Sequence, residues 1–167
     1  MTHTQSTCAL STWEICQSLA ERLTRNGLHL ATAESCTGGM IAAACTDLPR
    51  SSAWFDRGFI TYSNAAKTEL LAVEERLLRR DGAVCEGVAR AMVLGALSLS
   101  QGQVAISVTG VAGPKGGRPA KPVGTVWFGF AVPGQVITEK RHFEGDRAQV
   151  RTAAVHHALK RLLELLG

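Results

Sequence analysis

Apolar residues recur at intervals of three and four near both ends of the chain. From Cys8 to Arg25 this spacing predicts an amphipathic helix that ends near Asn26-Gly27. Its apolar positions are Leu10, Trp13, Cys16, Leu19, Ala20 and Leu23. A longer helix is predicted from about Asp146 to Leu166. Its apolar stripe is Val150, Ala154, Ala158, Leu162 and Leu165. Both helices are expected to place these residues against a core.

Short apolar runs between these helices predict a sheet. The strands are expected at residues 28–33, 55–62, 103–108, 123–132 and 136–143. Further helices are expected at residues 37–46, 64–71, 74–80 and 86–98, with Asn64 as the cap of the second. Pro133-Gly134 is the expected hairpin turn. Because helices lie between most strands, the predicted fold class is α/β: one three-layer α/β/α domain with a mixed sheet flanked by helices.

Length and composition fit one globular domain. The chain has 167 residues, of which 46% are hydrophobic and 19% charged. A domain of this length buries roughly two thirds of its unfolded surface. We expect the whole chain to form this domain, with residues 1–7 as a flexible N-terminal tail. No internal repeat or linker interrupts it.

Charge and cysteine usage narrow the expected partners and compartment. The net charge of +4 comes from scattered Lys and Arg, and aromatic residues make up only 5%, so nucleic-acid binding is not expected. No signal-peptide pattern and no apolar run of about 20 residues occurs, so we expect a cytoplasmic protein without a membrane partner. The five cysteines lack metal-binding spacing and are expected to be free thiols, with no metal or other cofactor.

The segment from Glu34 to Gly39 is the first candidate for chemistry. A helix that begins just after Ser35 would direct unpaired backbone N–H groups and the positive end of its dipole at an oxyanion or phosphate. Gly38 and Gly39 would permit close approach. A serine that merely caps the helix has the same pattern, so both interpretations stay open.

Cys36 is a rival nucleophile, because a thiol at a helix N-terminus can be acidified. Cysteine hydrolases usually need a histidine partner. The histidines here lie outside any recognisable motif: His3, His29, His142, His156 and His157. The last two are expected at the surface of the terminal helix.

Tyr62 and Lys67 form the second candidate, around a strand end and the helix turn after it. A lysine with its unperturbed pKa of about 10.4 is a poor base at pH 7, and burial must lower that pKa before it can deprotonate a serine. A serine without histidine needs such a lysine. A solvated helix lysine remains the alternative.

The third candidate is the glycine-rich segment from Ser107 to Gly117, a strand that leads into a loop. Its backbone N–H groups could bind phosphate or ribose. The segment lacks the spacing of the known nucleotide-binding loops, and an ordinary turn explains it equally well.

Several blocks together resemble the nicotinamide-nucleotide amidase family, which includes the C-terminal domain of the competence-damage-inducible protein CinA. The blocks are TAESCTGG at 32–39, SSAWFDRGFITYSNAAK at 51–67, TGVAGPKGG at 109–117, KPVGTVWF at 121–128 and GDRAQVR at 145–151. They occur in the family's order and cover the chain from about Ala31 onward.

The resemblance implies hydrolysis of the carboxamide of nicotinamide mononucleotide to nicotinic acid mononucleotide and ammonia, without a metal. It implies Ser35 as nucleophile, with Lys67 and Tyr62 in proton transfer. The expected oxyanion and substrate contacts are Cys36, Thr37, Gly38, Gly39, Asn64, Thr109, Gly110, Ala112 and Gly113. Arg147 and Arg151 are expected to form structural salt bridges, with phosphate binding as the alternative.

Three positions depart from the common family form: Lys115, Cys85 and Gly87 stand where Asp, Ser and Pro are usual. If residue 115 faces the pocket, its charge could alter nucleotide preference. The small size of the domain favours a homodimer. Two other functions remain open, namely a non-catalytic nucleotide-binding module and a serine amidohydrolase with a different amide substrate.

Overall fold

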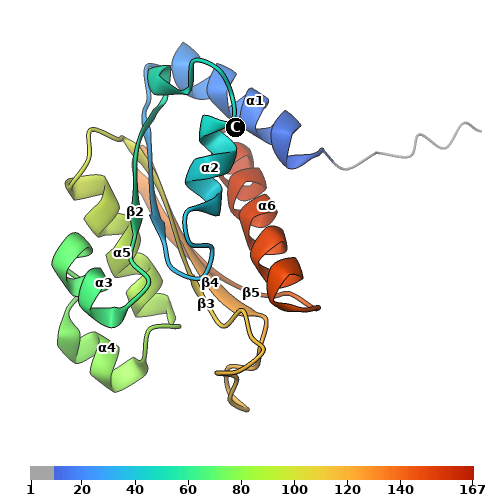
Figure 1. The fold of residues 1–167 in the computed structure, drawn as a ribbon. Coiled ribbons are helices and arrows are strands. Elements are labelled where there is room, and N and C mark those ends of the chain that lie inside the picture. The colour runs from blue at the N-terminus through green and yellow to red at the C-terminus, as the bar shows by residue number, and fades with distance from the viewer. Residues whose placement is uncertain (1–9) are drawn as a thin grey trace, which may run out of the picture.

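Five strands form one mixed sheet in the order β2-β1-β3-β4-β5 (Figure 1). The computed structural model describes residues 10–167, so the tail expected at residues 1–7 lies outside the described residues. The strands are β1 (Leu30–Glu34), β2 (Phe55–Ile60), β3 (Val104–Gly110), β4 (Thr125–Val132) and β5 (Gln135–His142). β1 is parallel to β2 and β3, whereas β4 is antiparallel to both its neighbours. The carboxyl ends of β1, β2 and β3 therefore share one edge, where open α/β sheets bind ligands.

Helices cover both faces of this sheet, which confirms the predicted three-layer α/β/α fold. The helices are α1 (Thr12–Arg25), α2 (Met40–Thr46), α3 (Asn64–Leu71), α4 (Glu75–Asp81), α5 (Glu86–Ser98) and α6 (Arg147–Leu165). A 3-10 turn, η1, spans Ser51–Ala53. Figure 1 shows α1, α2 and α6 on one face and α3, α4 and α5 on the other. We call these the α6 face and the α5 face.

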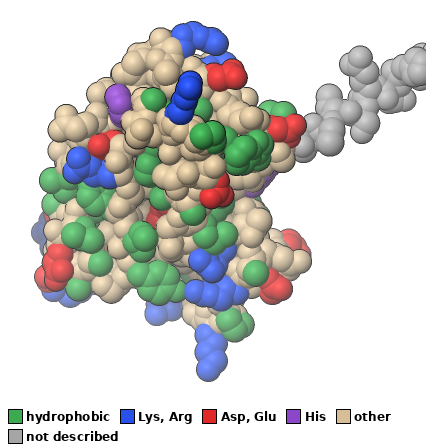
Figure 2. Space-filling view, turned by 45° about the horizontal axis from the view of Figure 1, so that its top comes forward, with side chains coloured by type: hydrophobic (Ala, Val, Ile, Leu, Met, Phe, Trp, Pro, Cys, Tyr) green, Lys and Arg blue, Asp and Glu red, His purple; other side chains and the backbone are tan. Residues whose placement is uncertain are grey.

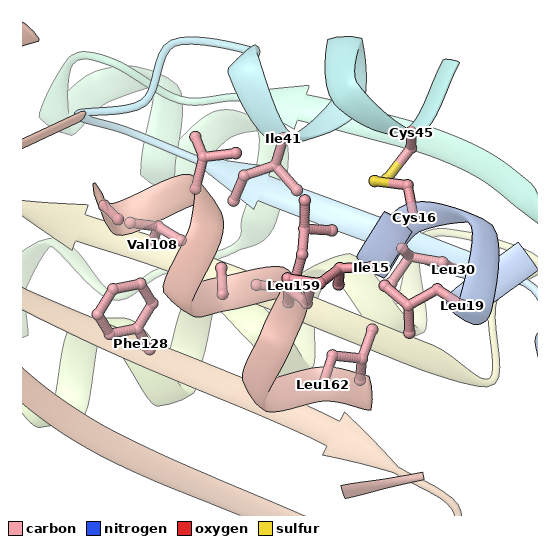
Figure 3. Close-up of a cluster of buried hydrophobic side chains, with 14 of the residues drawn as sticks. Ile15, Cys16, Leu19, Leu30, Ile41, Cys45, Val108, Phe128, Leu159 and Leu162 are labelled. Atoms are coloured by element: carbon pink, nitrogen blue, oxygen red, sulfur yellow. The ribbon is translucent and has the colours of Figure 1, made fainter. Parts of the chain in front are cut away.

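The larger hydrophobic cluster fills the α6 face (Figure 3). Ile15 and Leu19 of α1, Ile41 of α2 and Leu159 of α6 meet the side chains of the sheet there. Phe128 lies in the same layer, and its ring stacks on Phe130 with centroids 6.1 Å apart. Burial of this apolar surface stabilises the α6 face and holds α2 in place behind β1.

Small residues on the α5 face allow α5 to lie close to the sheet. The sheet residues of that cluster are Ala31, Ala33, Ala105 and Ala131. A Cβ added to Gly129 would lie 2.7 Å from the carbonyl oxygen of Ala89, and the Ser107 hydroxyl donates to the same oxygen at 2.6 Å. Because side chains alternate along a strand, Ser35 continues the α5 face of β1, whereas Glu34 faces α2 and α6.

The helix starts are where the sequence predictions were wrong. α2 begins at Met40 and not at Thr37, because Gly38 and Gly39 have positive φ angles of 60° and 98°. Ser63, and not Asn64, caps α3: its hydroxyl accepts from the Ala66 N–H at 3.0 Å.

The two terminal helices also differ in detail from the predicted ones. α1 begins at Thr12, after a capping box formed by Ser11 and Glu14. Two of its predicted apolar positions, Leu10 and Trp13, are each 48% exposed. The stripe of α6 is buried as predicted except for the half-buried Leu165, and the hairpin turn at Pro133-Gly134 is confirmed. In the described part of the chain, no helix is long and apolar enough to cross a membrane.

Candidate active site

Lys67 and Ser35 are in direct contact at the carboxyl edge of the sheet. Ser35 follows β1 immediately, and Lys67 lies one turn into α3. The Lys67 Nζ donates to Ser35 Oγ at 2.9 Å and to the carbonyl oxygen of Thr61 at 2.7 Å. Lys67 is 1% exposed and Ser35 is 8% exposed. The two groups that the sequence separates by 32 positions therefore form one buried pair.

Burial lowers the pKa of Lys67 from its ordinary 10.5 to about 8, although a thiolate at Cys36 would raise it. Among the described residues, no carboxylate forms an ion pair with this amine. Removing a charge from water without a counter-ion favours the neutral amine. With this pKa, about a tenth of the side chain is neutral at pH 7, so Lys67 can act as a base near neutrality.

The carboxylate of Glu34 occupies the N-terminus of α2. Glu34 is 1% exposed and accepts four hydrogen bonds at 2.7 to 3.1 Å. The donors are the Thr37 hydroxyl and the N–H groups of Gly39, Ile41 and Ala42. The expectation that this helix terminus faces a ligand is therefore wrong. Glu34 supplies the negative charge that a helix N-terminus attracts.

Two N–H groups in the turn remain available to a ligand. The Ser35 N–H bonds the Val108 carbonyl at 3.0 Å, and the Gly38 N–H bonds the Ser35 carbonyl at 3.0 Å. Among the described residues, the N–H groups of Cys36 and Thr37 have no acceptor from another residue. The candidate oxyanion site is therefore reduced from the four predicted positions to these two.

Arg151 of α6 fixes the orientation of the same turn. It donates to the carbonyl oxygens of Cys36 and Thr37 at 3.0 and 3.1 Å. In a trans peptide the N–H points opposite to the C=O. Because Arg151 holds the Cys36 carbonyl, the Thr37 N–H points away from Arg151.

The Cys36 thiol is poorly suited to be the nucleophile. Its side chain belongs to the hydrophobic cluster of the α6 face and is 6% exposed. Burial raises its pKa to about 11, so the thiol stays protonated at neutral pH. No histidine in the described residues forms a hydrogen bond with Cys36 or Ser35. His157, which was expected at the surface, packs against Phe128 with ring centroids 4.8 Å apart.

Tyr62 lies at the same edge but does not bond the lysine. It is 61% exposed, and its hydroxyl accepts from Arg147 at 2.8 Å. Arg147 also donates to the carbonyl of Gly113 at 2.9 Å, so it links the segments that follow β2 and β3. The predicted salt bridges of Arg147 and Arg151 are wrong, because both guanidinium groups bond neutral oxygens.

The loop residues predicted to contact a nucleotide shape the backbone of the site. The buried Thr109 hydroxyl donates to the Ala83 carbonyl at 2.8 Å. A Cβ on Gly110 would lie 2.7 Å from a Val126 methyl, and Ala112 is buried. Gly113 has a φ of 84°, and its carbonyl accepts from an arginine of α6.

Asn64 lies apart from these loop residues. It lines a cavity of about 230 Å³ between α3 and α4, whose other residues include Thr68 and Glu75. Asn64 forms no hydrogen bond with the Ser35 hydroxyl. It is linked to it only through α3, the helix that carries Lys67.

The chain matches the family model of the CinA C-terminal domain over residues 13–166. It belongs to the CinA C-terminal domain family. The nicotinamide-nucleotide amidohydrolase PncC of Enterobacter agglomerans is 53% identical over 151 residues, which cover 90% of this chain and 92% of that relative. The protein of the same name from Escherichia coli strain K12 is 47% identical over 150 residues, covering 89% and 91%. A crystal structure of a CinA superfamily protein from Enterobacter cloacae matches with a TM-score of 0.94 at 34% identity, covering 100% of this chain and 99% of that one.

The three departures from the common CinA form lie outside the Ser35–Lys67 contact. Lys115 is exposed on the glycine-rich loop. Cys85 occupies the N-cap of α5 without a side-chain cap bond, at a position where Ser is among the preferred residues. A Cβ on Gly87 would lie 3.2 Å from a terminal methyl of Leu77. None of these contacts reaches Lys67.

The hydrogen bonds of Glu34 and of the two arginines were not predicted from the sequence. The signal for Glu34 was present, because an acidic residue at the end of a buried strand and just before a helix can complement the helix dipole. The contacts of Arg147 and Arg151 join residues more than 30 positions apart, and no local pattern encodes them.

Replacing Glu34 by Gln is expected to lower the free energy of unfolding by about 2–3 kcal/mol, because hydrogen bonds to a charged acceptor are each worth about 1.5–3 kcal/mol. The glutamine amide group also places its own N–H donors against the backbone N–H donors of α2, and two donors cannot form a hydrogen bond with each other. Urea unfolding measures the loss. Glu69→Gln, an exposed change on α3, is the control. Equal stability of the two variants would contradict the role given to Glu34.

Replacing Lys67 by Met is expected to raise the free energy of unfolding at pH 7 by about 1–3 kcal/mol, since one pKa unit corresponds to about 1.4 kcal/mol. The folded-state pKa is about 8 against 10.5, so the unfolded chain binds more protons between these values. As the pH rises above about 8, the free energy of unfolding of the wild type therefore increases relative to that of the Met variant. Below pH 8 the difference between the two free energies is constant.

Urea unfolding at pH 7 and at pH 9.5 measures this linkage. The exposed Lys140→Met is the control, and its difference from wild type should not change over this range. A Lys67→Met protein whose stability relative to wild type is the same at both pH values would contradict the lowered pKa.

Proposed function

We propose that this chain is a nicotinamide-nucleotide amidohydrolase that uses Ser35 as nucleophile and Lys67 as general base. The observation that carries the proposal is the 2.9 Å contact between Ser35 Oγ and a buried amine whose pKa is lowered to about 8. A serine hydroxyl needs an adjacent base, and a lysine serves only when desolvation lowers its pKa.

The choice of substrate is supported by the named relatives. Proteins called nicotinamide-nucleotide amidohydrolase are 47–53% identical to this chain over about nine tenths of it. We therefore assign the carboxamide of nicotinamide mononucleotide as the bond that is cleaved, with nicotinic acid mononucleotide and ammonia as products.

In the first half of the proposed reaction, Ser35 Oγ attacks the amide carbon while neutral Lys67 accepts the hydroxyl proton. The carbonyl oxygen becomes an oxyanion. The N–H groups of Cys36 and Thr37 are the free donors beside Ser35 and would hold that charge. Lys67 then returns the proton to the amide nitrogen, and the carbon–nitrogen bond breaks to release ammonia.

In the second half, water attacks the ester that links the nicotinoyl group to Ser35. Lys67 accepts a proton from this water and passes it to Ser35 Oγ as the ester bond breaks. The Thr61 carbonyl, 2.7 Å from the amine, keeps Lys67 directed at Ser35 throughout. We place Tyr62 on the substrate side, where its hydroxyl, oriented by Arg147, would relay the proton that Lys67 returns to the amide nitrogen.

Ser35→Ala is expected to lower kcat for ammonia release from nicotinamide mononucleotide by at least about 1,000-fold, because it removes the nucleophile. Cys36→Ala is the matched control one residue away and should keep most of the activity. Ammonia release by the purified proteins is the measurement. If Cys36→Ala abolished turnover and Ser35→Ala did not, the thiol would be the nucleophile.

The wild-type protein itself decides between the remaining functions. Absence of ammonia from nicotinamide mononucleotide, together with binding of that nucleotide, would favour a non-catalytic nucleotide-binding module. Ammonia from another amide alone would favour an amidohydrolase with a different substrate.

The proposed base also predicts the pH dependence of the rate. Since kcat/KM reports the free enzyme, it should rise about tenfold per pH unit below pH 8 and level off above it. Lys67→Met should lose activity by about 100- to 10,000-fold and lose this dependence. Lys140→Met should keep the wild-type profile. A profile that is flat from pH 6 to pH 9 would exclude Lys67 as the base.

A further inference from the structure

A cavity of about 500 Å³ opens beside the glycine-rich loop, within the size range of small-molecule sites. We call it the basic cavity. One wall is the end of α4 and the turn before α5, and the other is the loop after β3. Its charged lining residues are Arg79, Arg80, Asp81, Arg118 and Lys121.

The basic cavity lies on the same face of the sheet as Ser35. The Ser35 N–H bonds the Val108 carbonyl, which places Ser35 beside the end of β3. The next residue, Thr109, points to the α5 face, where its hydroxyl bonds the Ala83 carbonyl. Ala83 and Val111 line the cavity. Thr109 therefore joins the cavity wall to the strand end beside Ser35, although neither Ser35 nor Lys67 lines the cavity.

Two of the cavity's four cations have no carboxylate partner. Arg79 pairs with Glu75 at 2.8 Å, and Arg80 pairs with Asp81 at 2.7 Å. Lys121 donates to the backbone carbonyl of Asp81 at 2.7 Å and forms no ion pair with a described carboxylate. Arg80 and, to a smaller extent, Lys121 lower the pKa of the Asp81 carboxyl. Arg118 forms no ion pair with any described residue.

These two cations lie close together. Arg118 and Lys121 exchange both backbone hydrogen bonds across a tight turn, at 3.0 and 2.9 Å. The loop that carries them projects at the lower edge of the molecule in Figure 1, and Figure 2 shows Lys and Arg side chains on and above this projection. A flexible amine and a planar guanidinium on one turn suit a phosphate, which offers several acceptor oxygens.

We propose that the basic cavity binds the 5′-phosphate of the substrate, with Arg118 and Lys121 as its cationic ligands. This assignment rests on the proposed function, because it takes the amide at Ser35 as the other end of the bound molecule. The carboxamide on the pyridinium ring then lies at the buried pair, and the phosphate lies in the more open, cationic part of the edge.

The arginines of α6 are the competing phosphate ligands. Arg147 uses its two terminal nitrogens on Tyr62 and Gly113, and Arg151 bonds two carbonyls of the turn after Ser35. These bonds fix the orientation of both guanidinium groups, although each keeps further N–H donors. The Arg118 side chain forms no hydrogen bond or ion pair with a described residue, so it can turn toward a ligand in the cavity.

The test compares ammonia release from nicotinamide mononucleotide with release from nicotinamide riboside, which lacks the phosphate. Wild type should prefer the mononucleotide in kcat/KM. Arg118→Gln and Lys121→Gln should each reduce this preference roughly 10- to 100-fold, mainly through KM, since each removes one charge-assisted contact. Arg118→Lys should recover part of it.

Arg76→Gln is the matched control. Arg76 lies on α4 with its side chain 83% exposed and outside the cavity lining, so the same loss of charge should leave the preference unchanged. Thermal unfolding checks that each variant is folded. Folded Arg118→Gln and Lys121→Gln proteins that keep the wild-type preference would overturn the proposal. Loss of the preference in Arg147→Gln alone would move the phosphate to α6.

The assay separates this inference from the proposed function. If wild type releases ammonia from neither compound, the function fails, and calorimetric titration with both compounds replaces the rate measurement. Tighter binding of the mononucleotide that Arg118→Gln and Lys121→Gln weaken would support the cavity assignment without the reaction. Equal binding of the two compounds by wild type would overturn it.

Discussion

The site depends on one buried amine that has no counter-ion. Lys67 can be a base near neutral pH only because α3, the end of β2 and Ser35 remove it from water while no carboxylate stabilises its charge. A carboxylate beside Lys67 would strengthen the fold and raise the pKa of the amine. An arrangement that lets Lys67 act as a base toward Ser35 therefore makes the folded protein less stable. This loss of stability is confined to the position where the proposed reaction moves a proton.

The acidic residue next to Ser35 in the chain faces the other side of the sheet. Glu34 is adjacent to Ser35, yet the alternation of β1 turns its carboxylate toward α2, where four donors hold it. This arrangement lets one strand end anchor a helix on the α6 face and present a nucleophile on the α5 face. The two glycines that follow delay the start of α2, so the N–H groups beside Ser35 stay outside the helix.

Much of the fold could be predicted from the sequence, because apolar spacing reports which faces are buried. That spacing predicted α5 within its observed bounds and the hairpin between β4 and β5. It could not place the start of α2, since Gly38 and Gly39 are compatible with a helix by composition and are excluded by their φ angles. The pairing of Ser35 with Lys67 was predicted because a serine nucleophile needs a base and because the sequence resembles the family. The contacts of Arg147 and Arg151 depend on the packing of α6 across the strand ends, which no local pattern encodes.

Charge is distributed unevenly along the ligand edge. Arg147 and Arg151 bond neutral oxygens at the side of α6, and Arg118 and Lys121 stand without carboxylate partners on the opposite loop. These groups leave the edge cationic, although acidic residues pair with most other arginines of the described chain. An anion bound beside Lys67 would favour the protonated form of this amine. A phosphate bound beside Lys67 would therefore weaken the base. Neither Ser35 nor Lys67 lines the basic cavity, so a phosphate held there acts on the amine from farther away. The separation between the basic cavity and the buried pair resolves this conflict.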